Sequence, residues 1–207
     1  MPITRTTESI QTSLGDTHGT RRKDRPAPFL SVVKADIQRF REEDDSLRNL
    51  IRGLLSQGFQ ALLVYRLFHW FHERAVPTQP IRFLVERFIE ITTGISIPAE
   101  ATIGKGLRIH HFGGIIIHSR AILGEHCTIY HGITLGDRGG WGGAPRVGNR
   151  VLIGAGAKLI GEVIIGDECI IGANAVVHTS VPAGHLAVGV PAITKRRDTT
   201  KPLCESR

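Results

Sequence analysis

A branched aliphatic residue recurs every six residues through the second half of the 207-residue chain, and this period restricts the fold more than any other feature. In an α-helix six residues turn the side-chain direction by roughly 600°, so the repeat cannot stay on one helical face. Flat strands joined by tight corners, three to a coil, do keep every aliphatic residue pointing inward. The series comprises Ile97, Ile103, Ile109, Ile115, Ile117, Leu123, Ile129, Leu135, Val147, Ile153, Leu159, Ile165, Ile171 and Val177.

The residues between these aliphatics support a stack of such coils. Four positions after the aliphatic stands a small or apolar residue, as at Ala101, Cys127, Val151, Ala157, Val163, Cys169, Ala175 and Val181. Glycine suits the corners, and 20 of the 24 glycines lie between Gly94 and Gly189, whereas nine of the twelve aromatic residues precede Gly94. The sequence therefore predicts an α+β chain in which a helical domain, residues 29–93, precedes a left-handed parallel β-helix of hexapeptide repeats, residues 94–194.

The period breaks at two places. The phase advances by two residues between Ile115 and Ile117, next to the run His-His-Phe-Gly-Gly at 110–114. Twelve residues separate Leu135 from Val147, and the glycine-rich stretch 137–145 between them is predicted to be an extruded loop. Repeat proteins place function where the repeat is interrupted, so the active groups are expected at these two breaks.

The remaining segments are assigned from their patterning. The run 58–71 is apolar on most sides and predicts a buried helix, and a further helix is expected between Pro80 and Gly94. These helices would cover one end of the β-helix. Residues 1–28 are polar and predict a disordered tail, and residues 195–207 are predicted to be a basic C-terminal tail.

Composition excludes several classes of protein. The net charge is +7, yet residues 94–194 hold seven basic and six acidic residues, so the predicted β-helix lacks the basic face that binds nucleic acid. The longest apolar stretch, 59–71, is too short to span a membrane. Three cysteines without CxxC spacing argue against a disulfide scaffold or a structural zinc site and favour a reducing, cytoplasmic location.

Several motifs along residues 34–194 together resemble one family. They are the helical run Gly-Phe-Gln-Ala-Leu at 58–62, the stretch Ile-Gly-Lys-Gly-Leu-Arg-Ile-His-His at 103–111, the strand and corner at 128–136, Ile-Gly-Ala-Gly-Ala-Lys at 153–158, and Gly-Val-Pro-Ala at 189–192. This combination resembles the serine acetyltransferases, a family of hexapeptide-repeat acyltransferases.

The resemblance implies acetyl transfer from acetyl-CoA to a hydroxyl, with His111 as the general base. It also implies that CoA lies in a groove between neighbouring subunits and is held mainly by backbone amides. The residues expected to bind the cosubstrate are Gly136, Ala155, Ala173, Lys195 and Arg196. No metal is expected.

The chain departs from the family on the acceptor side. Ser96 stands where the family has an aspartate that orients the catalytic histidine, and His110 stands where an aspartate precedes that histidine. A serine can hold an imidazole tautomer, so Ser96 is the second catalytic candidate, although it lacks the anion's charge. Gly143 and Ala144 replace an Arg-His pair that helps hold serine. The predicted acceptor pocket therefore consists of His110, His131 and Ala144.

These departures leave alternatives open. The acceptor is either serine, a serine-like compound, or the hydroxyl of a sugar, as in polysaccharide or secondary-metabolite biosynthesis. A metalloenzyme resembling hexapeptide carbonic anhydrases is a second hypothesis, because His126 and His131 have the spacing of two zinc ligands, but the position of a third, near Glu90, holds no histidine. A catalytically decayed β-helix scaffold is the third hypothesis.

The same resemblance implies the partners. A homotrimer would be the smallest working unit, and the helical domain would join two trimers into a hexamer. The chain ends in Glu205-Ser206-Arg207 rather than in isoleucine, so docking of a sulfhydrylase by the C-terminus is not expected.

Overall fold

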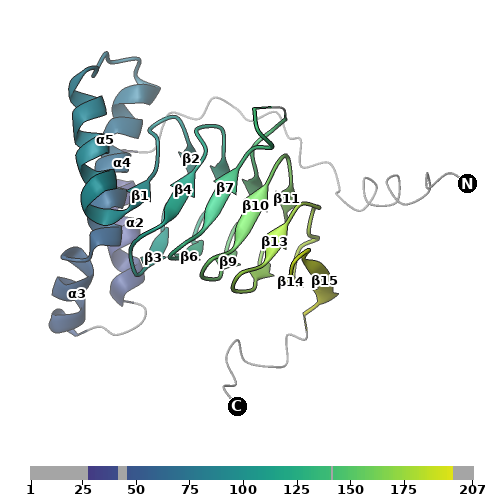
Figure 1. Cartoon of the computed structure of the whole chain (residues 1–207). Helices are drawn as coiled ribbons and strands as arrows, with labels where there is room; N and C mark the ends of the chain where they lie inside the picture. Colours follow the sequence, from purple (N-terminus) through teal and green to yellow (C-terminus); the bar gives the residue numbers. More distant parts are fainter. Residues whose placement is uncertain (1–27, 42–45, 141, 198–207) are drawn as a thin grey trace, which may run out of the picture.

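The computed structural model describes residues 28–41, 46–140 and 142–197. The predicted tails, apart from residues 28 and 195–197, and Trp141 at the loop tip lie outside the described residues. Four helices come first: α2 (Phe29–Arg41), α3 (Leu47–Leu54), α4 (Gln57–Glu73) and α5 (Ile81–Thr93). They stand together at one end of a stack of strands (Figure 1). No described helix is long and apolar enough to cross a membrane.

The strands form three parallel sheets that run along the stack. Sheet A comprises β1 (Ile95–Ser96), β4 (Ile115–Ile117), β7 (Thr134–Gly136), β10 (Lys158–Ile160) and β13 (Val176–Val177). Sheet B comprises β2 (Thr102–Ile103), β5 (Ile122–Leu123), β8 (Arg146–Val147) and β11 (Ile164–Ile165). Sheet C comprises β3 (Arg108–His110), β6 (Thr128–Tyr130), β9 (Leu152–Ile153), β12 (Ile170–Ile171), β14 (His185–Val188) and the antiparallel β15 (Ile193–Arg196). The chain visits A, B and C in turn, so the predicted β-helix is confirmed.

Strand pairing shows where residues are inserted into the coils. Lys158 pairs with Val176, eighteen residues later, which is three sides of six residues. Arg108 pairs with Thr128, twenty residues later, so the first coil holds two extra residues. Thr128 pairs with Leu152, twenty-four residues later, so the next coil holds six extra residues. Both interruptions predicted from the six-residue period are present.

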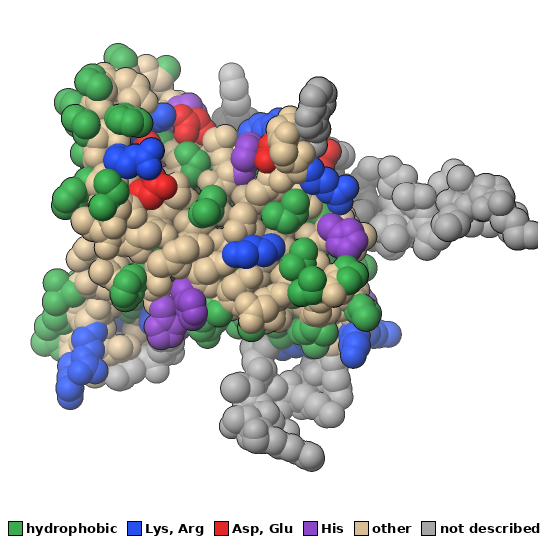
Figure 2. Space-filling model, viewed as in Figure 1, with side chains coloured by type: hydrophobic (Ala, Val, Ile, Leu, Met, Phe, Trp, Pro, Cys, Tyr) green, Lys and Arg blue, Asp and Glu red, His purple; other side chains and the backbone are tan. Residues whose placement is uncertain are grey.

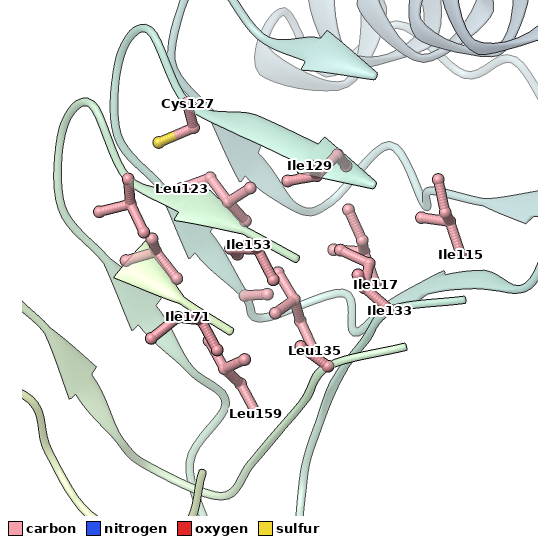
Figure 3. Packing of buried hydrophobic residues seen from close by; sticks show 14 of the residues in the cluster. Ile115, Ile117, Leu123, Cys127, Ile129, Ile133, Leu135, Ile153, Leu159 and Ile171 are labelled. Atoms are coloured by element: carbon pink, nitrogen blue, oxygen red, sulfur yellow. The ribbon is translucent and has the colours of Figure 1, made fainter. Parts of the chain in front are cut away.

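The repeating aliphatics fill the interior of the β-helix, as predicted, and stack from coil to coil (Figure 3). A narrow interior explains the scarcity of aromatic residues after Gly94, since three short sides leave room for aliphatic and small side chains. Residues with no exposed surface include Ile115, Ile129, Ile133, Leu135, Ile153, Leu159 and Ile171, with Cys127, Ala157, Cys169 and Ala175 at the corners.

Local signals set the helix boundaries. Ser46 and Ser56 cap α3 and α4, because their hydroxyls accept the backbone N–H groups of Asn49 and Phe59. Helix α5 begins directly after Pro80 and ends at Gly94, which has a left-handed φ of 65°. A left-handed residue at this position costs least as glycine and turns the chain into the first strand.

A buried polar contact joins the helices to the first coil. Arg66 of α4 pairs with Asp36 of α2 and donates to the carbonyl oxygens of Ile103 and Gly104. Asp36 in turn accepts the N–H groups of Gly106 and Leu107 at 2.7 and 3.1 Å. The helical bundle is therefore fixed to the coil that leads to His110 and His111.

Candidate functional site

The two-residue insertion lies at the corner between sheets C and A. His110 still pairs with Tyr130 in the next coil, while the N–H of Gly132 donates to the carbonyl of Gly113 at 2.9 Å. The coil of His110 therefore contains two residues, His111 and Phe112, that have no counterpart in the next coil. Both are exposed, and His111 has a φ of 63°. Positive φ also occurs at other corners of the β-helix, as at His126 and Asn174, so this conformation turns the chain and does not by itself distinguish His111.

Three histidines and a tyrosine gather at this corner. The ring of His111 meets the ring of His131 edge to face, with centroids 5.6 Å apart and planes at 81°. The His110 ring stacks on Tyr130 at 4.9 Å and 13°. The structure therefore brings together three of the predicted site residues, His110, His111 and His131. Tyr130 was not singled out from the sequence, although its outward place opposite His110 in the repeat would have indicated it.

The predicted cosubstrate residues Ala155 and Ala173 lie on the same corner, farther along the stack. The N–H of Gly156 donates to the backbone carbonyl of His131, and the N–H of Asn174 donates to the backbone carbonyl of Ala155, so successive corners are stacked directly on one another. Ala155 is half-buried and Ala173 is exposed. His111, His131, Ala155 and Ala173 thus form one column, called here the corner column. Its later members, Ala155 and Ala173, are small, so no long side chain covers the corner there.

Ser96 lies on the outer side of β1, in a cavity of about 170 Å³ shared with helix α5. The cavity is also lined by Glu86 and Glu90, and burial raises the pKa of the Glu86 carboxyl. Among the described residues, no hydrogen bond joins Ser96 to His111. The structure therefore places the two catalytic candidates on one coil without bringing their side chains into contact.

The residues predicted around the extruded loop are divided between surface and core. Gly136 ends β7 directly before the loop and is half-buried. The loop is held by Asp137, which accepts the N–H of Gly140 at 2.8 Å, and by Arg120, which donates to the carbonyl of Gly142 at 2.9 Å. Ala144 is only 5% exposed and packs in the hydrophobic core. Its methyl group thus faces the interior rather than a surface pocket.

Lys195 and Arg196 belong to β15, which runs antiparallel to β14. Both side chains are exposed. The pairing sets Arg196 opposite His185, at the end of β14 that is farthest from the corner column. Within one chain, therefore, Arg196 does not lie near Ala173.

His126 and His131, the two residues of the metal hypothesis, lie at opposite ends of β6. His126 occupies the corner between sheets B and C, with a φ of 56°. Within the described parts of the chain, no group of three or more histidine, cysteine, aspartate or glutamate side chains is arranged to hold a metal ion.

Comparison with known proteins identifies the family. Residues 144–179 match the family described as bacterial transferase hexapeptide (six repeats). The chain is 42% identical over 165 residues to a serine acetyltransferase of Helicobacter pylori strain J99, covering 78% of this chain and 95% of that protein.

Solved structures agree with this match. A serine acetyltransferase of Neisseria gonorrhoeae in complex with serine superposes with a TM-score of 0.73 at 31% identity, covering 80% of this chain and 68% of that one. A serine acetyltransferase of Brucella abortus in complex with coenzyme A gives a TM-score of 0.73 at 30% identity, covering 80% and 67%. With the repeats, the helical domain and nearly the whole length of a relative matched, the chain belongs to the serine acetyltransferase family and is an acyltransferase.

Proposed function

We propose that the protein transfers the acetyl group of acetyl-CoA to the hydroxyl of serine, with His111 as the general base. The observation that carries this proposal is the position of His111. Its imidazole is exposed on a two-residue insertion, meets a second imidazole, and begins the corner column that ends in small residues.

The corner column supports the choice of donor. CoA is the ligand in the related Brucella abortus structure, and its long chain needs an open surface along which backbone groups can bind. Ala155 and Ala173 supply such a surface on the same corner as His111. Gly136 lies at the far end of β7 in sheet A, one strand length from that corner. Lys195 and Arg196 keep their predicted role at the phosphates only if a neighbouring subunit's groove receives them, because their strand points away from their own column.

The relatives support the choice of acceptor. The chain is similar over most of its length to serine acetyltransferases, one of which was solved with serine. Serine is therefore favoured over a sugar hydroxyl. His110 and His131 remain the proposed acceptor contacts, because both surround His111.

The chemical step needs one base. The neutral imidazole of His111 takes the proton of the serine hydroxyl while the oxygen attacks the thioester carbonyl. The tetrahedral intermediate then collapses, the carbon–sulfur bond breaks, and the imidazolium returns its proton to the leaving CoA thiolate. The products are O-acetylserine and CoA. Ser96 is proposed to support the imidazole once substrates are bound, since catalytic hydrogen bonds often form only in the complex.

Free thiol released from acetyl-CoA tests the proposal. Wild-type protein is expected to release thiol with serine and to show little release with a sugar acceptor. His111→Ala should lower kcat by about 100-fold or more, as expected for removal of a general base. His185→Ala, at the opposite edge of sheet C, is the matched control and should keep wild-type activity. Unchanged kcat in His111→Ala would overturn the mechanism.

We also propose a homotrimer or hexamer. Support comes from helix α5, whose outer face carries the exposed residues Ile81, Leu84, Phe88 and Ile91. Analytical ultracentrifugation of the full chain checks this proposal, and a sedimenting monomer at assay concentration would overturn it.

A further inference from the structure

The outer face of sheet A carries one ladder of side chains from coil to coil. Pairing aligns Ser96 with Ile116, Ile116 with Thr134, Thr134 with Lys158, and Lys158 with Val176. Of these five residues only Lys158 is charged. Figure 2 shows this side of the molecule, where basic side chains lie among large areas of uncharged surface.

Lys158 is held in a defined place. It is half-buried, and its ammonium donates to the carbonyl oxygen of Gly132. The N–H of the same glycine donates to Gly113, in the segment that follows His111. The ammonium of Lys158 therefore lies beside the corner of His131, next to the coil that carries His111.

The charge of Lys158 lacks a partner within the described part of the chain, since no carboxylate there pairs with it. An ammonium has three donors, and Gly132 takes one of them. The nearest outward neighbour across the ladder, Thr134, offers a hydroxyl. An ammonium and a hydroxyl side by side suit a carboxylate, whose two oxygens accept charge-assisted hydrogen bonds.

The spacing suits a small amino acid. Adjacent coils lie about 4.8 Å apart, and a hydrogen bond to an ion adds about 2.8 Å at either end. An acceptor whose hydroxyl binds His111 can thus place its carboxylate at the next coil. The ammonium of Lys158 contacts Gly132 of that coil, although β10 itself lies one strand farther along sheet A. We propose that Lys158 binds the carboxylate of the amino-acid acceptor and thereby selects acceptors that carry one. This inference rests on the proposed function.

The test compares two acceptors that differ only in this group, L-serine and L-serinamide, by thiol release from acetyl-CoA. Wild type is expected to prefer serine by about 10- to 100-fold in kcat/KM, the range for hydrogen bonds to a charged group. Lys158→Gln should lose about 10- to 100-fold with serine, chiefly through a higher KM for serine. Its kcat/KM with serinamide should stay within about threefold of wild type.

Two further variants separate binding from structure. Lys158→Arg keeps the charge and should retain most of the preference for serine. Lys105→Gln removes an exposed lysine at the other corner, paired with Glu125, and should behave as wild type. Thermal unfolding of Lys158→Gln checks that loss of the Gly132 contact has not unfolded the corner.

The outcomes are distinct. Equal losses with serine and serinamide in Lys158→Gln would overturn the inference in favour of a structural or oxyanion-stabilising role. An unchanged preference for serine would overturn it as well, while wild-type thiol release with serine would leave the proposed function standing. Absence of any wild-type release with serine would overturn both.

Discussion

Arg66 and Asp36 form a buried ion pair, with Nε and Oδ2 2.9 Å apart and side chains only 4% and 2% exposed. The pair joins helices α4 and α2, and both partners also bind backbone groups of the first coil. Through these contacts the helical bundle holds the end coil, which has no preceding coil to pair with, in its β-helix conformation.

Removing one partner of this pair is expected to be costly. Arg66→Met leaves the Asp36 carboxylate buried without its cation, which should lower the free energy of unfolding by about 3–5 kcal/mol. Urea unfolding followed by circular dichroism measures the change. The double variant Asp36→Leu/Arg66→Met should recover part of the loss. Arg150→Ala, which breaks an exposed pair with Glu168, is the control and should unfold near wild type. Equal stability of Arg66→Met and wild type would contradict the expectation.

Gly94 is predicted to control the corner that carries His111. It has a φ of 65°, and an added Cβ would lie 2.9 Å from the Cα of Gly113. Gly94→Ala should lower the free energy of unfolding by about 1–3 kcal/mol through strain and also lower kcat by displacing the insertion. Gly139→Ala is the matched control, with a φ of 64° but no atom within 4 Å of the added Cβ. Its cost should be about 1 kcal/mol, that of a left-handed conformation for a residue with a Cβ atom. Indistinguishable effects of the two changes would show that contact with Gly113 is unimportant.

Ser96 is predicted to support the imidazole of His111 in the reacting complex. Ser96→Ala should lower kcat by about tenfold and leave the KM for acetyl-CoA unchanged, because the hydroxyl assists a base that remains present. Steady-state thiol release measures both constants. Ser96→Thr retains a hydroxyl and should keep more activity than the alanine variant. Identical kcat values for Ser96→Ala and wild type would remove Ser96 from the mechanism.

Stability is expected to fall in alkali because of Tyr65. Its hydroxyl donates to Ala101 and accepts the N–H of Ile103, and burial raises its pKa above the ordinary value of 10.0. Above about pH 10 the unfolded chain loses this proton while the folded chain keeps it. The free energy of unfolding therefore falls by roughly 1.4 kcal/mol per pH unit. Urea unfolding at pH 9 and 11 measures the fall. Tyr65→Phe should be less stable at pH 9 but show a weaker pH dependence; an equal dependence would contradict this assignment.

The thiols of Cys127 and Cys169 are expected to be unreactive in the folded protein. Both are fully buried, and burial raises the pKa of each thiol. Alkylation by iodoacetamide at pH 8 should be at least about 100-fold slower than in guanidinium, because the reactive thiolate is both scarce and inaccessible. Peptide mass spectrometry follows each cysteine separately. Rapid labelling of either residue under native conditions would show that the coils open locally.

The site was only partly predictable. The resemblance to the serine acetyltransferases assigns His111, beside the break in the repeat, and also Ala155 and Ala173, and these roles stay predictions. The structure adds that Ala155 and Ala173 occupy the same corner of successive coils. The inward direction of the Ala144 side chain was not predicted, because Ala144 was assigned to the pocket from the family residue that it replaces and not from its place in the repeat. The same holds for Lys195 and Arg196, because a strand that reverses at the end of the stack has no counterpart in the period.

The sequence by itself determined the architecture, because a six-residue aliphatic period is compatible with three-sided coils and incompatible with a helix. It also determined the position of both interruptions. Only the tertiary structure decided which side chains meet across coils: His111 with His131, His110 with Tyr130, and Lys158 with Gly132. The physical reason is that these contacts join residues twenty to twenty-six positions apart, and their register depends on how many residues each corner inserts.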